Sequence, residues 1–263
     1  MASGWQLANV GYAYGTTPAL ADLSLAIEPG GFYGVVGPNG SGKTTLVDLL
    51  IGEKAPSAGE IRFDGRAPAA WRRRDLARRV ALVPQEFRVQ FGFSVLDVVL
   101  MGRHPYLPRF AGPGEEDLAV VERMLDLLDV RHLCARPVTE LSGGEKQRVV
   151  AARALAQDTP YLLLDEATSS LDISHCLKIL RAVRQGVERQ GRTVIAVLHD
   201  LNLAAAFADR LIVLHRGRLA ACGPVAEVLD AELIDRVFGV RALVEREGKT
   251  TRVLYNYGEE GRQ

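Results

Sequence analysis

The sequence is poor in cysteine, has no excess charge of either sign and contains no long hydrophobic run. Its three cysteines, Cys134, Cys176 and Cys222, are odd in number and form no C-x-x-C pair, which favours reduced structural thiols over a disulfide framework or a zinc site. The 32 basic and 32 acidic residues leave a formal net charge of zero. A dedicated nucleic-acid binder would carry a basic excess, so the composition argues against that class.

Membrane-spanning segments are not predicted either. No apolar run approaches the roughly 18 to 20 residues that a spanning helix needs, and the amino terminus MASGWQLANV lacks the basic and hydrophobic regions of a signal peptide. We therefore expect a soluble protein of the cytosol. With 263 residues and 48% hydrophobic content, the chain can bury the core of one large domain or two modest ones.

Short apolar runs without alternation predict strands that are buried on both faces. They lie at residues 32–36, 80–83, 161–164, 194–198 and 211–214. Such strands are typical of a parallel sheet, and helical patterns such as SHCLKILRAVRQGVERQ lie between them. The sequence therefore predicts an α/β fold with a mostly parallel sheet. The earlier segments QLANVGYAY, LSLAI and GEIRF predict shorter strands of an antiparallel edge.

A long block, residues 84–160, separates two of the predicted strands. It is too long for a simple connection, and its segments 94–101 and 115–128 are helical in pattern. This block predicts a helical subdomain inserted at about 86–156.

The remainder of the chain divides into a core and a tail. The core comprises residues 1–85 and 157–223, on either side of the insertion. The tail, residues 224–263, is predicted to add two short helices and a hairpin that turns at Glu247-Gly248-Lys249.

A glycine-rich loop follows the strand at 32–36 and precedes the helical segment LVDLLIG. It matches G-x-x-x-x-G-K-[ST] in the strand-loop-helix context that phosphate binding requires. Its residues are Gly37, Pro38, Asn39, Gly40, Ser41, Gly42, Lys43, Thr44 and Thr45. In such a loop the backbone N–H groups converge on phosphate oxygens, Lys43 reaches the β and γ phosphates, and Thr44 ligates Mg²⁺. The loop therefore predicts a nucleoside triphosphate site.

An acidic pair, Asp165-Glu166, ends the strand at 161–164. The carboxyl edge of a parallel sheet is where ligands of open α/β folds bind. Asp165 is predicted to hold the Mg²⁺ shell, and Glu166 to position and deprotonate an attacking water, with most of the rate enhancement coming from electrostatic stabilisation. Without the phosphate loop, such a pair is also typical of a solvated surface or a helix cap.

Two glycines stand where a helix is predicted to begin, in LSGGEKQRV. Gly143 and Gly144 are each disfavoured in a helix by roughly 1 kcal/mol relative to alanine. Ser142 and Glu145 fit a capping box, so the segment is consistent with an ordinary helix start. The alternative is that the missing side chains let a phosphate approach the helix N-terminus.

This segment resembles the signature motif of ABC transporter ATPases, and further motifs of that family occur in order around it. The loop from Gly37 to Thr45 is similar to their Walker A loop, residues 83–85 (VPQ) to the Q-loop, and 162–166 (LLLDE) to Walker B. Three more residues resemble the D-loop aspartate, the switch histidine and the aromatic that stacks on adenine: Asp172, His199 and Tyr14.

The resemblance implies a fold, cofactors and an arrangement of subunits. It implies a P-loop NTPase core with an N-terminal antiparallel β subdomain and an inserted α-helical subdomain, forming one ATPase domain over residues 1–240, with ATP and Mg²⁺ as cofactors. In this family two ATPase subunits bind head to tail. Ser142, Gly143, Gly144 and Glu145 would then contact the ATP held by the partner's Walker A loop. Gln85 would contact Mg²⁺ or the attacking water, and His199 the γ-phosphate.

Further similarity points to a subgroup of the family. The segments FSVLDVVLMGRHPYL (93–107) and HDLNLAA (199–205) resemble importers of iron-siderophore complexes, haem and cobalamin. This implies a homodimer on the cytoplasmic face of the inner membrane, a permease bound at about 87–110, a solute-binding protein in the same system, and no nucleic acid. Ala167 is a departure, because many import-type ATPases have proline there and alanine is commoner in exporters.

Three alternatives remain open from the residues alone. Importers of zinc, manganese or molybdate form the next subgroup. A non-transport ABC ATPase would clamp nucleic acid or a ribosome, but such proteins usually carry two cassettes or long coiled-coil insertions. A scaffold with a degenerate site conflicts with the presence of Lys43, Asp165, Glu166 and His199.

Overall fold

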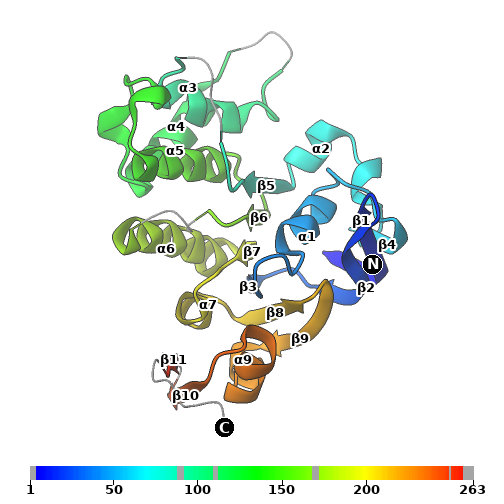
Figure 1. Cartoon of the computed structure of the whole chain (residues 1–263). Coiled ribbons are helices and arrows are strands. Elements are labelled where there is room, and N and C mark those ends of the chain that lie inside the picture. Colours follow the sequence, from blue (N-terminus) through cyan, green and yellow to red (C-terminus); the bar gives the residue numbers. More distant parts are fainter. Residues whose placement is uncertain (1–3, 88–91, 109–111, 168–171, 249, 257–263) are drawn as a thin grey trace.

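Three sheets form in the part of the chain that the computed structural model describes, which is residues 4–87, 92–108, 112–167, 172–248 and 250–256. A six-stranded sheet lies at the centre, beside a three-stranded antiparallel sheet formed by the N-terminal part of the chain (Figure 1). A two-stranded hairpin lies near the carboxyl end. Within these residues no helix has the length and apolarity needed to cross a membrane.

The central sheet contains every strand that the unbroken apolar runs predicted. Its order is β5 (Val80–Val83), β6 (Tyr161–Leu164), β7 (Thr193–Val197), β3 (Gly31–Val36), β8 (Arg210–His215) and β9 (Arg218–Pro224). The first five are parallel, and β9 pairs with β8 in antiparallel register. The predicted α/β fold with a mostly parallel sheet is confirmed.

Strand β3 explains why these runs show no alternation. Phe32 and Val36 belong to the hydrophobic core on the side of the inserted helices, whereas Tyr33 and Val35 belong to the core on the side of the N-terminal sheet. Because side chains of a strand point alternately to its two faces, both faces must be apolar when both are covered. The strand that leads into the phosphate loop is therefore anchored from both sides.

The N-terminal sheet has the order β2 (Thr17–Ile27), β1 (Trp5–Tyr14) and β4 (Ala58–Phe63). The predicted antiparallel pairing is confirmed. The expectation of shorter strands is wrong for β1 and β2, which are 10 and 11 residues long. Each has many exposed positions along one face, so a search for continuous apolar runs detects only part of each strand.

A cluster of aromatic rings joins the N-terminal sheet to the central sheet. The ring of Trp5 lies 4.4 Å from that of Phe63 and 4.9 Å from that of Tyr161, measured between centroids. The indole Nε1 of Trp5 donates a hydrogen bond to the carbonyl of Leu50, at the end of the helix that follows the phosphate loop. Few aromatics occur in the chain, and these three fix the two sheets together, since such ring pairs add about 0.5–1.5 kcal/mol each.

The helical patterns of the sequence correspond to helices in the structure, whereas no pattern predicted the short helix α2. Three of them, α3 (Val95–Leu100), α4 (Glu115–Leu127) and α5 (Gly143–Ala156), gather beyond β5 at the top of Figure 1. The others are α1 (Lys43–Leu50), α2 (Arg73–Ala77), α6 (Ile173–Gln190), α7 (Leu201–Phe207), α8 (Val225–Val228) and α9 (Ala231–Phe238). The division into core, insertion and tail at the stated boundaries stays a prediction.

The carboxyl-terminal hairpin, β10 (Ala242–Glu247) and β11 (Thr250–Tyr255), is hydrogen-bonded to α7 through the side chain of Asn202. Asn202 Nδ2 donates to the carbonyl oxygen of Val253 at 3.1 Å, and its Oδ1 accepts from the backbone N–H of Val253 at 2.7 Å. An asparagine that makes both bonds imitates a neighbouring strand, so it holds the hairpin in one register.

An ion pair fixes the start of α4 to the rest of the helical group. Arg103 Nε donates to Asp117 Oδ1 at 2.8 Å, and Arg103 NH1 donates to the carbonyl oxygen of Ala156 at 2.9 Å. The side chains are 10% and 15% exposed. The bond to Arg103 holds the pKa of Asp117 below its ordinary value.

Replacing Asp117 with asparagine is expected to destabilise the protein by about 1–3 kcal/mol near neutral pH, because the guanidinium of Arg103 stays buried without its carboxylate. A carboxyl with a lowered pKa stabilises the fold at pH values above its unfolded pKa of about 3.9, and this contribution is lost as the pH falls through its folded pKa. The difference between wild type and variant in urea unfolding should therefore shrink below about pH 4. The exposed Asp235→Asn on α9 is the matched control, and an unchanged difference at acid pH would contradict the assignment.

Candidate active site

The phosphate loop adopts a conformation that its glycines make possible. Gly42, which precedes α1, has a φ of 99°, and a Cβ there would lie 2.7 Å from the carbonyl oxygen of Ala19. Both the backbone angle and the lack of space therefore require glycine. The loop leads directly into α1, whose first residue is Lys43. Free backbone N–H groups and the positive end of the helix dipole thus meet at one point, which favours a phosphate.

Lys43 is buried within this loop. Its Nζ donates to the carbonyl oxygens of Gly37 at 2.9 Å and Pro38 at 3.0 Å. Burial lowers the pKa of Lys43, while the nearby carboxylates of Glu166 and Asp165 act in the opposite direction. A buried ammonium held beside bare backbone N–H groups provides the positive charge that β and γ phosphates need.

Asp165 and Thr44 lie together at the carboxyl edge of the sheet. Thr44 Oγ1 donates to Asp165 Oδ1 at 3.3 Å. Asp165 is 6% exposed, and burial raises its pKa to about 6, with the charge of Glu166 raising it further and the bond from Thr44 lowering it. A buried carboxylate beside a second carboxylate is stabilised by a cation. Hydroxyl and carboxylate oxygens are ligands that suit Mg²⁺, which uses only one or two carboxylates when a phosphate completes its shell. The residues present therefore fit that ion.

Two residues that lie far from Glu166 in the sequence meet at its carboxylate. Gln85 Nε2 donates to Glu166 Oε2 at 2.7 Å, and His199 Nε2 lies 2.8 Å from Glu166 Oε1. The backbone of Glu166 has a φ of 48°, a value that residues with side chains rarely adopt. The backbone and two side chains therefore hold this carboxylate in one orientation, as a water-positioning group requires.

A cleft of about 520 Å³ connects these groups to the phosphate loop. Residues of the phosphate loop line it together with Gln85, Glu166 and Tyr14. The ring of Tyr14 is 50% exposed, and its hydroxyl lies 3.2 Å from Thr45 Oγ1. An exposed ring fixed at its far end can stack against a planar base.

The cleft also contains residues that sequence reasoning missed. Thr17, Pro18 and Ala19, at the start of β2, line it beside the loop. No motif marks them, and only the hairpin between β1 and β2 brings them to the loop.

The signature segment, defined as Ser142, Gly143, Gly144 and Glu145, does not line this cleft. Ser142 caps α5, since its Oγ accepts from the backbone N–H of Glu145 at 3.3 Å and donates to Glu145 Oε2 at 2.7 Å. This bond lowers the pKa of Glu145. The predicted capping box is therefore present. A Cβ on Gly143 would meet no atom within 4 Å, so the backbone there is bare.

Asp172 is the N-cap of α6 and also lies outside the cleft. Its Oδ1 accepts from the backbone N–H of His175 at 2.9 Å, and its Oδ2 lies 2.7 Å from His175 Nδ1. The bond from the His175 backbone is the main reason that the pKa of Asp172 is lowered. The resemblance to the D-loop also includes Ser170 and Leu171, which lie outside the described residues.

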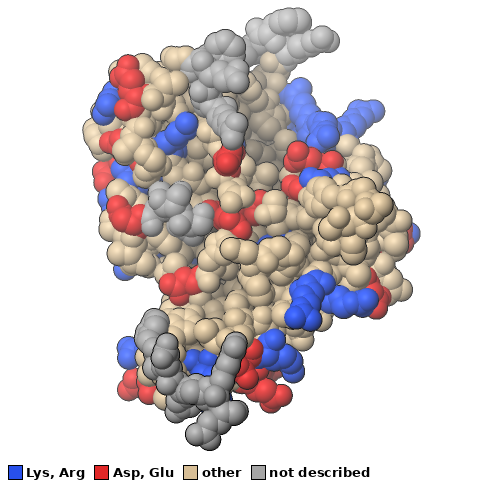
Figure 2. Space-filling view, viewed as in Figure 1, with Lys and Arg blue, Asp and Glu red and all other residues tan. Residues whose placement is uncertain are grey.

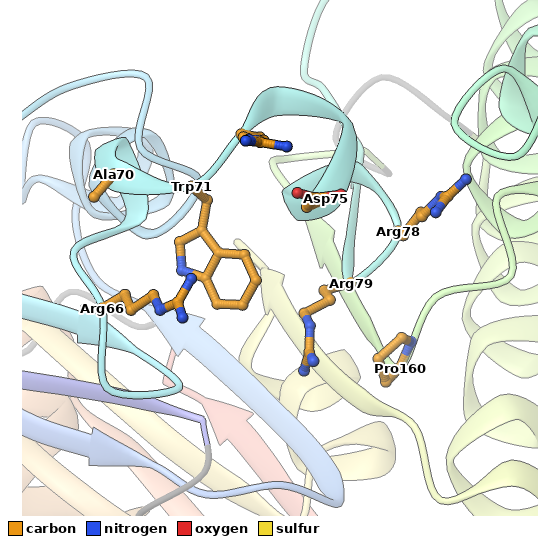
Figure 3. Close-up of a pocket in the computed structure, with 8 residues that line it drawn as sticks. Arg66, Ala70, Trp71, Asp75, Arg78, Arg79 and Pro160 are labelled. Carbon is orange, nitrogen blue, oxygen red and sulfur yellow. The ribbon is translucent and has the colours of Figure 1, made fainter.

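A second hollow lies near α2, where Lys and Arg side chains gather in the space-filling view (Figure 2). In it the indole of Trp71 lies between the guanidinium groups of Arg66 and Arg79, at 5.6 and 5.2 Å from the ring centroid (Figure 3). Arg79 also pairs with Asp64 at 2.8 Å. Arg78 donates to the carbonyl oxygen of Pro105. These arginines make contacts within the fold, and no residue of the phosphate loop lines this hollow.

Comparison with known sequences gives a consistent result. The ABC transporter family profile matches residues 20–169. The hemin import ATP-binding protein HmuV of Myxococcus xanthus is 45% identical over 232 residues, which cover 86% of each chain. The cobalamin import ATP-binding protein BtuD of Halobacterium salinarum is 43% identical, over 90% of this chain and 59% of that one.

Solved structures show the same fold. An inward-facing ABC transporter of the metal-chelate type aligns with a TM-score of 0.81 and 30% identity, covering 96% of both chains. A dimeric structure of the bacterial ABC transporter cassette MJ0796 aligns with a TM-score of 0.75 and 30% identity, covering 84% of this chain and 98% of that one.

Proposed function

This chain belongs to the ABC transporter family and is an ATPase, and we propose that it drives the uptake of haem, cobalamin or an iron-siderophore complex through a separate permease. The observation that carries the mechanism is the convergence of Gln85 and His199 on Glu166 beside the phosphate loop. The most similar sequences reported above are import subunits, which supports the direction of transport.

The proposed reaction is the attack of water on the γ-phosphate of ATP bound in the cleft. Lys43 and the loop N–H groups bind the phosphates, and the ring of Tyr14 stacks on the adenine. Glu166 orients the water through one carboxylate oxygen and accepts its proton late, while Gln85 and His199 keep that carboxylate in place. In the ATP-bound state we propose that His199 donates a hydrogen bond to the γ-phosphate as charge develops.

Mg²⁺ is proposed as the cofactor, with Thr44 and Asp165 as ligands. Gln85 uses its amide Nε2 to hold Glu166, which leaves its Oε1 as a third oxygen ligand. When bound, the ion neutralises charge on the β and γ phosphates. A bound cation would lower the raised pKa of the buried Asp165, because it favours the carboxylate form.

A homodimer in head-to-tail contact is proposed to complete the site. The signature segment has an exposed Ser142 and a bare Gly143, yet no member of it lines the cleft of its own chain. Beside Asp172, Ile173 is 62% exposed, more than any other large apolar side chain in the described part of the chain. An exposed apolar residue beside the N-termini of two helices favours a face that a partner covers.

The permease is proposed to bind at residues 87–110, on the cytoplasmic face of the inner membrane, with a solute-binding protein in the same system. Within this segment α3 begins at a capping box formed by Ser94 and Asp97. Phe87 packs beneath the guanidinium of Arg153 on α5 at 4.3 Å. Residues 88–91, 109 and 110 of this segment lie outside the described residues. A force on this segment would reach α5, whose first turn carries the signature segment.

Ala167 does not decide the direction of transport. It is 2% exposed and belongs to the main hydrophobic core, so its size is set by packing. The exporter-like residue is therefore compatible with an import subunit.

The test uses the full chain expressed with each candidate polytopic permease of the same genome and reconstituted in vesicles. Uptake of haem, cobalamin and a ferric hydroxamate is measured with ATP on the side of this chain. We expect one of these ligands to be transported and to stimulate phosphate release several-fold, and duplex DNA to have no effect. A chain that fails to co-purify with the permease, or whose turnover responds to DNA alone, would refute the proposal.

A further inference from the structure

His175 has no part in the proposed reaction, yet its ring lies against the signature segment. A Cβ built on Gly144 would lie 3.1 Å from His175 Nδ1 and 3.4 Å from its Cε1. The same construction on Gly143 meets nothing within 4 Å. The two adjacent glycines therefore serve different purposes. Gly143 leaves a bare surface, whereas Gly144 makes room for a side chain of the same subunit.

The ring of His175 cannot move freely out of the way. Its Nδ1 lies 2.7 Å from Asp172 Oδ2, while its backbone N–H is bound to Asp172 Oδ1. Asp172 is itself fixed as the N-cap of α6. The side chain is 29% exposed, so most of it is covered by neighbouring atoms. A methyl group at position 144 would press on the ring near Nδ1, the atom that the contact with Asp172 Oδ2 holds in place.

We propose that His175 is a positioning residue whose ring, held by Asp172, fixes the first turn of α5 against the N-terminus of α6. This inference rests on the proposed head-to-tail site, because the signature segment is proposed to contact the partner's nucleotide and Asp172 lies beside Ile173 on the same proposed interface. His175 touches neither phosphate nor water. It holds the first turn of α5 and the N-terminus of α6 in a fixed relative position. The N–H groups of the signature segment are then aligned with the partner's nucleotide when the dimer forms.

The proposal is tested in the Glu166→Gln chain by ATP-dependent dimerisation, followed by analytical ultracentrifugation. Gly144→Ala is expected to raise the ATP concentration needed for half-maximal dimerisation about three- to tenfold, because contacting residues couple on this scale. In a chain that also carries His175→Ala, the same Gly144→Ala change should barely alter this ATP concentration, because the imidazole ring that the new methyl group would contact is absent. His175→Ala alone should weaken dimerisation, and His175→Asn should restore part of it through an amide donor to Asp172.

Gly143→Ala is the matched control. Its Cβ meets no atom of the chain, so its effect on dimerisation should be the same with and without His175. If the ring only stabilised the fold, removing it would not change the effect of alanine at position 144 more than the effect of alanine at position 143. Equal costs of Gly144→Ala in the two backgrounds would overturn the proposal.

A second measurement separates this proposal from the proposed function. Urea unfolding of the chain without nucleotide reports the contact between Gly144 and His175 directly. Gly144→Ala should lower stability with His175 present and raise it with His175→Ala, because alanine then keeps its helix preference without the collision. If the Glu166→Gln chain fails to dimerise with ATP, the proposed head-to-tail dimer is wrong. The urea measurement still decides whether the ring of His175 packs against Gly144.

Discussion

Replacing Glu166 with glutamine is expected to lower ATP turnover about 100-fold or more while ATP binding is retained. Glutamine keeps the size of the side chain, and its amide oxygen can still accept from Gln85. It cannot accept a proton or attract the attacking water as a carboxylate does. Phosphate release and nucleotide binding, measured on the same preparation, check both parts of this expectation.

The same change should also trap the dimer. If hydrolysis separates two head-to-tail subunits, a chain that binds ATP without splitting it accumulates as a dimer at ATP concentrations where wild type does not. Glu116→Gln, an exposed carboxylate in the first turn of α4, is the control and should behave as wild type. Full turnover in Glu166→Gln would show that another group positions the water.

Replacing Lys43 with alanine is expected to weaken ATP binding by about 2–4 kcal/mol, or roughly 30- to 1000-fold in Kd, because a buried charged donor to the phosphates is lost. The conformation of the loop is expected to become less well fixed, because Lys43 Nζ donates hydrogen bonds to the carbonyl oxygens of Gly37 and Pro38. Isothermal calorimetry with ATP and Mg²⁺ measures the effect. Turnover should fall with it, whatever the ATP concentration, because the same ammonium stabilises the departing phosphate.

Lys178 provides the control for this lysine. It forms an exposed pair with Asp129 at 2.6 Å on the outer side of α6, and pairs of this kind contribute only about 0–1 kcal/mol. Lys178→Ala should therefore bind ATP as wild type does. Wild-type affinity in Lys43→Ala would mean that the loop N–H groups alone carry phosphate recognition.

Local patterns predicted the sites that are built from consecutive residues. The phosphate loop is such a site, because a strand, a glycine-rich turn and a helix start follow one another within a few residues. The carboxylates of Asp165 and Glu166 were predicted for the same reason, since they end a buried strand. Motif order, and not residue chemistry, pointed to Gln85 and His199.

Tertiary structure was needed where partners come from distant segments. Gln85 and His199 reach Glu166 because β5, β6 and β7 are parallel neighbours whose carboxyl ends meet at one edge. Thr17, Pro18 and Ala19 line the cleft because the N-terminal sheet places them beside the phosphate loop. No short sequence pattern predicts either contact, because each joins residues that are far apart in the chain.

The two glycines of the signature segment show the division most clearly. The sequence by itself determined that a helix begins at this point with unfavourable residues, since helix preference and capping are properties of adjacent positions. It could not distinguish one glycine from the other. Only the folded chain decided that Gly143 faces open space and Gly144 faces His175, because the space around a backbone atom is set by whatever packs against it, and that neighbour comes from another helix.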